Sequence, residues 1–90
     1  MTRPELIDAV AEKTGQSRKD VEDVLRAAED TIAATLKKRE KVTLTGFGTF
    51  EVRHRKARTG RNPQTGATIQ IPGKAVPAFS AGKGLKDDVA

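Results

Sequence analysis

Apolar residues near the start of the chain recur every three or four positions, which is the spacing of an amphipathic helix. A first helix is predicted to begin at Thr2, where pairing with Glu5 fits a capping box, and to stop at Gly15, a residue typical of helix C-termini. Its apolar positions are Leu6, Ile7, Val10 and Ala11. They predict a short helix with one apolar face.

A second, longer helix is predicted to begin at Ser17, with Asp20 as the acidic partner of another capping box. It is expected to end near residues 37–39, whose cations suit the negative end of a helix dipole. About twenty helical residues span ~30 Å, and the apolar stripe is longer than one short helix can cover. The stripe therefore predicts contact with a second copy of the chain. Its members are Val21, Val24, Leu25, Ala28, Ile32, Thr35 and Leu36.

Beyond residue 40 the pattern changes to the two-residue alternation of β-strands. Val42 and Leu44 alternate with polar residues, and the glycines within 46–48 indicate a turn. A continuous extended segment is predicted over residues 49–58. Ten extended residues cover ~33 Å, which is more than a small core can support. This strand is therefore expected to run beyond the body of the protein.

The returning half of this hairpin is predicted over residues 68–71, with 72–73 (Pro-Gly) breaking the ladder. Between the two halves, residues 59–66 have the Gly, Asn and Pro content of a turn. Phe79 is expected to re-enter the core, and a last helix to start near Ser80, which can cap it. That helix would carry Lys83, Leu85, Lys86 and Val89.

These elements predict an α+β fold with two helices, a small antiparallel sheet, a long protruding hairpin and a terminal helix. A single domain is expected over 1–90. We divide it into a helical dimerisation part (1–40), a sheet (41–80) with an arm at about 53–75, and a C-terminal helix (81–90). Only 3% of the residues are aromatic, so the core of one chain is expected to be thin.

Charge is distributed unevenly along the chain. The protein has 17 Lys and Arg against 12 Asp and Glu, a formal net charge of +5. Residues 1–40 carry 8 basic and 9 acidic side chains, whereas 41–90 carry 9 basic and 3 acidic ones. The stretch 52–86 contains no carboxylate at all. A folded surface with charge of one sign is typical of proteins that bind polyanions, although the same charges could serve only to solvate the surface.

The composition argues against several function classes. The chain has no cysteine and one histidine, His54, which argues against disulfides, thiolate metal sites and His-based catalysis, so no cofactor or metal is expected. The carboxylate-free basic half offers no cluster to hold a nuclease metal, so an enzyme is not expected. No apolar run approaches ~20 residues and no signal-peptide pattern is visible, so we expect a cytoplasmic protein without membrane contact.

The predicted arm is the strongest candidate for binding. Arg53 and Arg55 share one face of a strand, and Arg58 and Arg61 follow towards the tip. The planar guanidinium group suits phosphate, and a two-stranded ribbon is narrow enough to lie in a groove of DNA. The alternative is an edge hairpin that uses charge to prevent aggregation. At the tip, Pro63 could belong to an ordinary turn or could act as a rigid apolar wedge between base pairs.

Three ordered motifs of the chain resemble the signature of the bacterial histone-like HU family. They are Gly-Phe-Gly-Thr-Phe-Glu-Val-Arg at 46–53, Gly-Arg-Asn-Pro-Gln-Thr-Gly at 60–66, and Val-Pro-Ala-Phe at 76–79. The likeness covers essentially all 90 residues. It implies an intertwined homodimer with a helical base, whose two β-arms wrap around DNA in the minor groove. HU and its relative IHF are established examples of architectural proteins that bind this groove with apolar wedges.

The resemblance implies a largely sequence-independent protein that bends duplex DNA and compacts the nucleoid, with Pro63 as the intercalating wedge. Nicked, junction or otherwise distorted DNA is the expected preference, and RNA is a further possible partner. The alternative is a sequence-selective, IHF-like DNA-bending subunit. Many family members have Lys and Pro where this chain has Ser80 and Ala81, which would weaken one body contact to DNA. The full set of candidate DNA-binding residues is Arg3, Arg53, Arg55, Arg58, Arg61, Asn62, Pro63, Lys74, Lys83 and Lys86.

Overall fold

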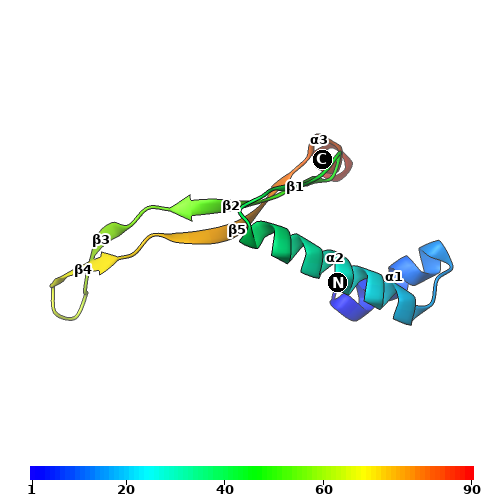
Figure 1. Ribbon diagram of the computed structural model, residues 1–90, viewed down its shortest axis with the longest axis horizontal. Coiled ribbons are helices and arrows are strands. Elements are labelled where there is room, and N and C mark those ends of the chain that lie inside the picture. Colours follow the sequence, from blue (N-terminus) through cyan, green and yellow to red (C-terminus); the bar gives the residue numbers. More distant parts are fainter. The chain divides into compact units, whose positions relative to one another are not determined.

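The computed structural model describes residues 1–90 and divides them into two compact units, Met1–Ala34 and Thr35–Ala90. The elements follow in the order α1 (Arg3–Thr14), α2 (Arg18–Lys37), β1 (Val42–Leu44), β2 (Gly48–Arg55), β3 (Arg58–Arg61), β4 (Thr68–Ile71), β5 (Lys74–Ala81) and α3 (Lys83–Val89). These three helices and five strands confirm the predicted α+β fold, and their labels can be followed in Figure 1. None of the helices has the length and apolarity needed to cross a membrane.

The first unit packs α1 against α2 over a small apolar core. The buried residues are Ile7, Ala11 and Val21, with Leu25 packed against them. Beside this core lies a groove of about 360 Å³, whose lining includes Leu6, Val10 and Val24. These three apolar side chains are 40%, 36% and 69% exposed. The apolar stripe predicted from the sequence is therefore largely uncovered within one chain.

The starts of the two helices differ in how they are capped. Ser17 Oγ accepts a hydrogen bond from the Asp20 N–H at 3.1 Å, which confirms the predicted start of α2. The capping box predicted at Thr2 is wrong, because the Thr2 hydroxyl donates to Glu5 Oε1 at 3.1 Å and caps no backbone N–H. Pro4 lies in this first turn and has no N–H, so one of the usual partners of a capping hydroxyl is missing.

Both helices end where the sequence predicts, each followed by a residue with left-handed backbone. Gly15 has a φ of 72°, and its N–H donates to the Ala11 carbonyl at 2.9 Å. After Lys37, Arg39 has a φ of 63°, and its N–H donates to the Leu36 carbonyl at 2.9 Å. These hydrogen bonds satisfy carbonyls that the helix ends would otherwise leave unpaired.

The strands of the second unit form two antiparallel sheets. The larger has the order β1-β2-β5, and β2 pairs with β5 from Gly48 opposite Ala81 to Arg55 opposite Lys74. The smaller consists of β3 and β4. In Figure 1 the ribbon of β2 and β5 continues into β3 and β4 and ends in a loop. We call residues 53–75 the arm.

The single long strand predicted over 49–58 is wrong. The ladder stops after Arg55 and resumes at Arg58, because residues 56–57 face 72–73 on the returning strand. The returning strand is interrupted at residues 72–73, between β4 and β5, which confirms the predicted break. Its cause is that Pro72 has no N–H to donate to a ladder. The predicted turn over 59–66 is also too long, because its first three residues belong to β3.

Three phenylalanines pack together at the root of the larger sheet. The ring centroids of Phe50 and Phe79 are 4.9 Å apart, and those of Phe47 and Phe79 are 5.6 Å apart. Phe47 and Phe79 nevertheless remain 49% and 42% exposed, so one chain does not enclose the core expected for Phe79. Gly48 is buried in this cluster, and a Cβ built there would meet the Phe79 ring and lie 2.7 Å from the Ser80 carbonyl oxygen.

The last helix begins at Lys83, three residues after the predicted start. Ser80 does not cap it, because Ser80 lies within β5 opposite Thr49. The residue before α3 is Gly82, whose N–H donates to the Phe47 carbonyl at 2.8 Å. This bond ties the start of α3 to the turn between β1 and β2.

Candidate nucleic-acid interface

The root of the arm carries closely spaced positive charges on adjacent strands. Arg55 ends β2 and lies directly opposite Lys74, which begins β5. Both side chains are exposed, and neither makes an ion pair. Like charges that face each other across a ladder repel. An anion bound between the two side chains would relieve this repulsion.

Arg53 differs from its neighbours because it has a carboxylate partner. Its Nε and Nη2 atoms each donate to Glu51 Oε1 at 3.3 Å, and Nη2 also donates to Ser80 Oγ at 3.0 Å. Lys41 Nζ lies 3.7 Å from Glu51 Oε2. The hydrogen bond from Arg53, together with Ser80 and Lys41, lowers the pKa of Glu51. Part of the charge of Arg53 is therefore neutralised within the protein.

The two faces of the outer arm differ in chemistry. Residues directly opposite each other in a ladder share a face, so Arg58, Gly60, Ile69 and Ile71 lie on one face. Ile71 Cδ1 is 2.9 Å, and Ile69 Cγ1 3.6 Å, from the point where a Gly60 Cβ would lie. The isoleucines therefore cover the glycine. Arg61 lies on the opposite, polar face, so arginines are present on both faces.

The tip is a turn closed by hydrogen bonds on both sides of Pro63. The Asn62 N–H donates to the Ala67 carbonyl at 2.8 Å, and the Gly66 N–H donates to the Asn62 carbonyl at 2.7 Å. Asn62 Oδ1 accepts from the Gln64 N–H at 2.9 Å. Gly66 has a φ of 71°, a conformation that suits glycine. Pro63 is exposed at this turn.

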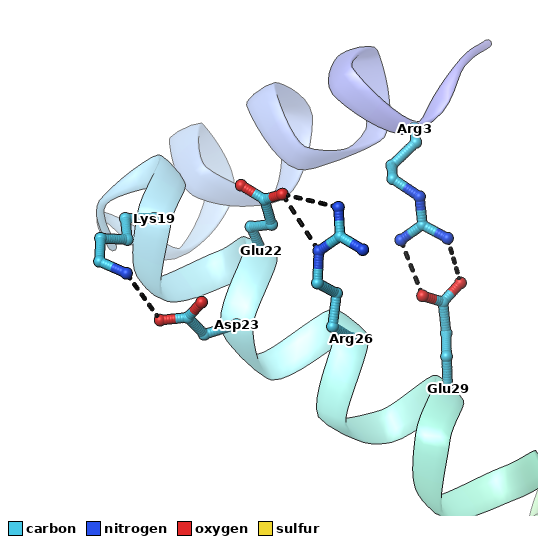
Figure 2. A network of polar contacts seen from close by, with 6 residues as sticks. All are labelled: Arg3, Lys19, Glu22, Asp23, Arg26 and Glu29. Carbon is cyan, nitrogen blue, oxygen red and sulfur yellow. Dashed lines mark hydrogen bonds and ion pairs between the residues drawn. The ribbon is translucent and has the colours of Figure 1, made fainter.

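The three remaining candidates lie outside the arm. Lys83 and Lys86 are exposed on α3 and make no ion pair. Arg3 belongs to the first unit, where its two terminal nitrogens donate to the two carboxylate oxygens of Glu29 at 2.7 Å each (Figure 2). This pairing raises the pKa of Arg3 and lowers that of Glu29.

Sequence reasoning overlooked the partners of two arginines. Glu51 lies two residues before Arg53 on the same strand, a spacing that places both side chains on one face and could have been noticed. Glu29 is 26 residues from Arg3, and no local pattern indicates that they meet. Figure 2 also shows Glu22 paired with Arg26 and Lys19 with Asp23, so the outer surface of α2 is largely balanced in charge.

No group of three or more His, Cys, Asp or Glu side chains is placed to hold a metal ion. The chemistry available at the arm is that of exposed guanidinium and ammonium groups, amide donors, two isoleucines and two prolines, of which Pro63 lies at the tip. Such groups bind phosphate oxygens and insert into grooves.

Several known proteins are similar to this chain over nearly its full length. The sequence model of the family described as bacterial DNA-binding protein matches residues 1–90. DNA-binding protein HU of Geobacillus stearothermophilus is 55% identical over 89 residues, which cover 99% of each chain. The structure of Anabaena HU in a cocrystal with DNA matches with a TM-score of 0.92 at 52% identity, covering 100% of this chain and 98% of that one. HU from Thermotoga maritima matches with a TM-score of 0.73 at 38% identity, covering 100% of both chains.

Proposed function

The chain belongs to the family of bacterial DNA-binding proteins that includes HU, and we propose that it is an architectural protein that wraps and bends double-stranded DNA with little sequence preference. In this proposal the two arms of a homodimer lie in the minor groove and Pro63 enters a base step. The role is structural rather than enzymatic, and its place is the nucleoid, where it contributes to compaction of the chromosome.

One observation carries this proposal: beyond Arg53, which is paired with Glu51, the arm is a cationic ribbon whose charges have no acidic partner. Arg55, Arg58, Arg61 and Lys74 make no ion pair, and residues 52–86 contain no carboxylate. Contacts to phosphate give affinity and orientation but carry no sequence information directly. An interface of this composition supports binding to the DNA backbone with little base readout.

The IHF-like, sequence-selective alternative is not favoured. The relatives described above are HU proteins, and they match over nearly the full length of both chains. In the minor groove, where the arms are proposed to lie, base edges distinguish little more than A·T from G·C pairs. The relatives and the proposed groove therefore both support general rather than site-specific binding.

Homodimer formation is supported by the apolar surface that one chain leaves exposed. Three buried residues make too small a core for a stable domain, and Leu6, Val10 and Val24 line an open apolar groove. The stripe continues along α2 with Ile32 and Leu36. A second copy of the same helix surface would bury this stripe by symmetry.

Gel shifts at two salt concentrations test the proposal. They compare equal lengths of linear, nicked and four-way-junction DNA with RNA. Distorted DNA should bind most tightly, random competitor DNA should displace straight duplexes of every sequence equally, and raising the salt should weaken all complexes. A complex that survives excess random DNA on one sequence only would contradict the architectural role and favour the IHF-like alternative.

A further inference from the structure

Asn62 makes more of the hydrogen bonds at the tip than any other residue there. Its N–H, carbonyl and side-chain oxygen bond to Ala67, Gly66 and Gln64, at 2.8, 2.7 and 2.9 Å. It is also half-buried, whereas the next three residues are exposed. Pro63 has no N–H and makes no side-chain hydrogen bond, so its position depends on the bonds of its neighbours.

The bond from the Gln64 N–H to Asn62 Oδ1 spans Pro63. It closes an Asx turn, in which the asparagine side chain takes the place of a backbone carbonyl. Because the two bonded groups belong to the residues on either side of Pro63, the bond restricts the backbone rotation that would tilt the proline ring. Proline itself fixes only its own φ, near −65°.

We propose that Asn62 is a positioning residue, whose side-chain oxygen holds Pro63 in the orientation needed to enter a base step. The inference rests on the proposed function, in which Pro63 is the wedge. It differs from the role given to Asn62 as one of the candidate DNA-binding residues, in which its side chain contacts DNA directly. In the present proposal the essential group is the acceptor Oδ1, and the amide donor Nδ2 is dispensable.

Substitutions of Asn62 separate these two roles. Asn62→Ala removes both the acceptor and the donor, whereas Asn62→Asp keeps an acceptor for the Gln64 N–H and loses only the donor. Thr65→Ala is the matched control, because it removes the bond from the Ala67 N–H to Thr65 Oγ1 at 3.2 Å, which does not span Pro63. Amide hydrogen exchange of β3 and β4 in the free protein verifies that each variant retains the arm.

The first measurement is exchange of the Gln64 amide in the free protein. Asn62→Ala should accelerate it about three- to tenfold, the range expected for loss of one hydrogen bond, and Asn62→Asp should leave it protected. The second is the ratio of affinities for nicked and straight duplexes of the same sequence. Charge repulsion by Asn62→Asp weakens both complexes together, so the ratio should persist in that variant and in Thr65→Ala, but should fall in Asn62→Ala.

A double-mutant cycle with Pro63→Ala completes the test. If Asn62 acts through Pro63, the double variant should have the same affinity ratio and the same rate of DNA ring closure as Pro63→Ala alone. The inference would be overturned if the effects of the two single substitutions on the affinity ratio multiplied in the double variant. It would also be overturned if Asn62→Asp and Asn62→Ala lost the ratio equally, and either result would favour direct contact by the amide. If Pro63→Ala leaves the ratio unchanged, the wedge of the proposed function is itself refuted.

Discussion

The strength of the arm's electrostatic contribution can be tested at Arg55. This residue makes no ion pair and faces Lys74 across the ladder, so its full charge is available to a phosphate. In a homodimer, Arg55→Ala removes two such charges. We expect DNA of every sequence to be bound more weakly, with the largest loss at low salt.

The magnitude follows from counterion release. Each phosphate neutralised on duplex DNA contributes about −0.9 to the slope of log K against log salt, so two lost contacts should flatten that slope by about 1.8. Over a fourfold range of salt, such as about 50 to 200 mM, the affinity of the variant should therefore fall roughly tenfold less than that of the parent protein. Arg53→Ala should flatten the slope less, because Glu51 already neutralises part of that charge.

Fluorescence anisotropy titrations of a labelled duplex at four or more salt concentrations would measure these slopes. Lys13→Ala is the matched control, since Lys13 is an exposed, unpaired cation of the helical unit and its loss changes net charge equally. An unchanged slope for Arg55→Ala, or an equal flattening for Lys13→Ala, would refute the assignment of Arg55 to the DNA backbone. A change confined to one sequence would indicate base readout instead.

Three further predictions concern the body of the protein. Val24→Asp should abolish the dimer in sedimentation experiments. Val24 is 69% exposed in one chain and belongs to the apolar stripe of α2 that the second copy is proposed to cover, so a folded dimer of this variant would contradict the proposal. Gly48→Ala should lower the free energy of unfolding in urea by about 1–3 kcal/mol, because the added Cβ would meet the Phe79 ring and lie 2.7 Å from the Ser80 carbonyl oxygen. A smaller loss would show that the ring and this backbone both move freely. The pKa of Glu29 is lowered by its hydrogen bond from Arg3, so the resulting stability is present above the ordinary pKa of 4.5 and is lost as the pH falls through the lower folded value. Melting temperatures from about pH 6 to pH 3 should therefore fall less steeply in Glu29→Gln, and identical pH profiles would contradict this.

Local patterns were sufficient to predict the helices and most strand positions. The ends of both helices depend on residues close in sequence, such as Gly15, and the break opposite 56–57 depends on the missing N–H of Pro72. The start of α3 was misplaced because Ser80 satisfies the local rule for a cap. The ladder with β2 instead keeps Ser80 extended, and its hydroxyl donates to Glu51 at 3.3 Å.

The candidate site was predictable as a set of charges but not as a set of contacts. A stretch without carboxylates is visible in the sequence whatever its fold, so the basic arm was predicted directly. Whether each cation is free depends on partners distant in the chain, as the pairing of Arg3 with Glu29 shows. The hydrogen bond that spans Pro63 depends on the side-chain rotamer of Asn62, which composition does not indicate.

The same charges that attract DNA also oppose the folding of the arm. A two-stranded ribbon has no core behind it, and outside β2 and β5 the arm is held by two four-residue strands, β3 and β4, with two isoleucines over Gly60. Arg55 and Lys74 repel each other at the point where the ribbon leaves the larger sheet. A bound phosphate removes this repulsion because it interacts with both cations at once. Ordering of the arm and binding of DNA are therefore coupled. Salt screens the repulsion and the attraction alike, and it follows that added salt should stabilise the free arm while it weakens the complex.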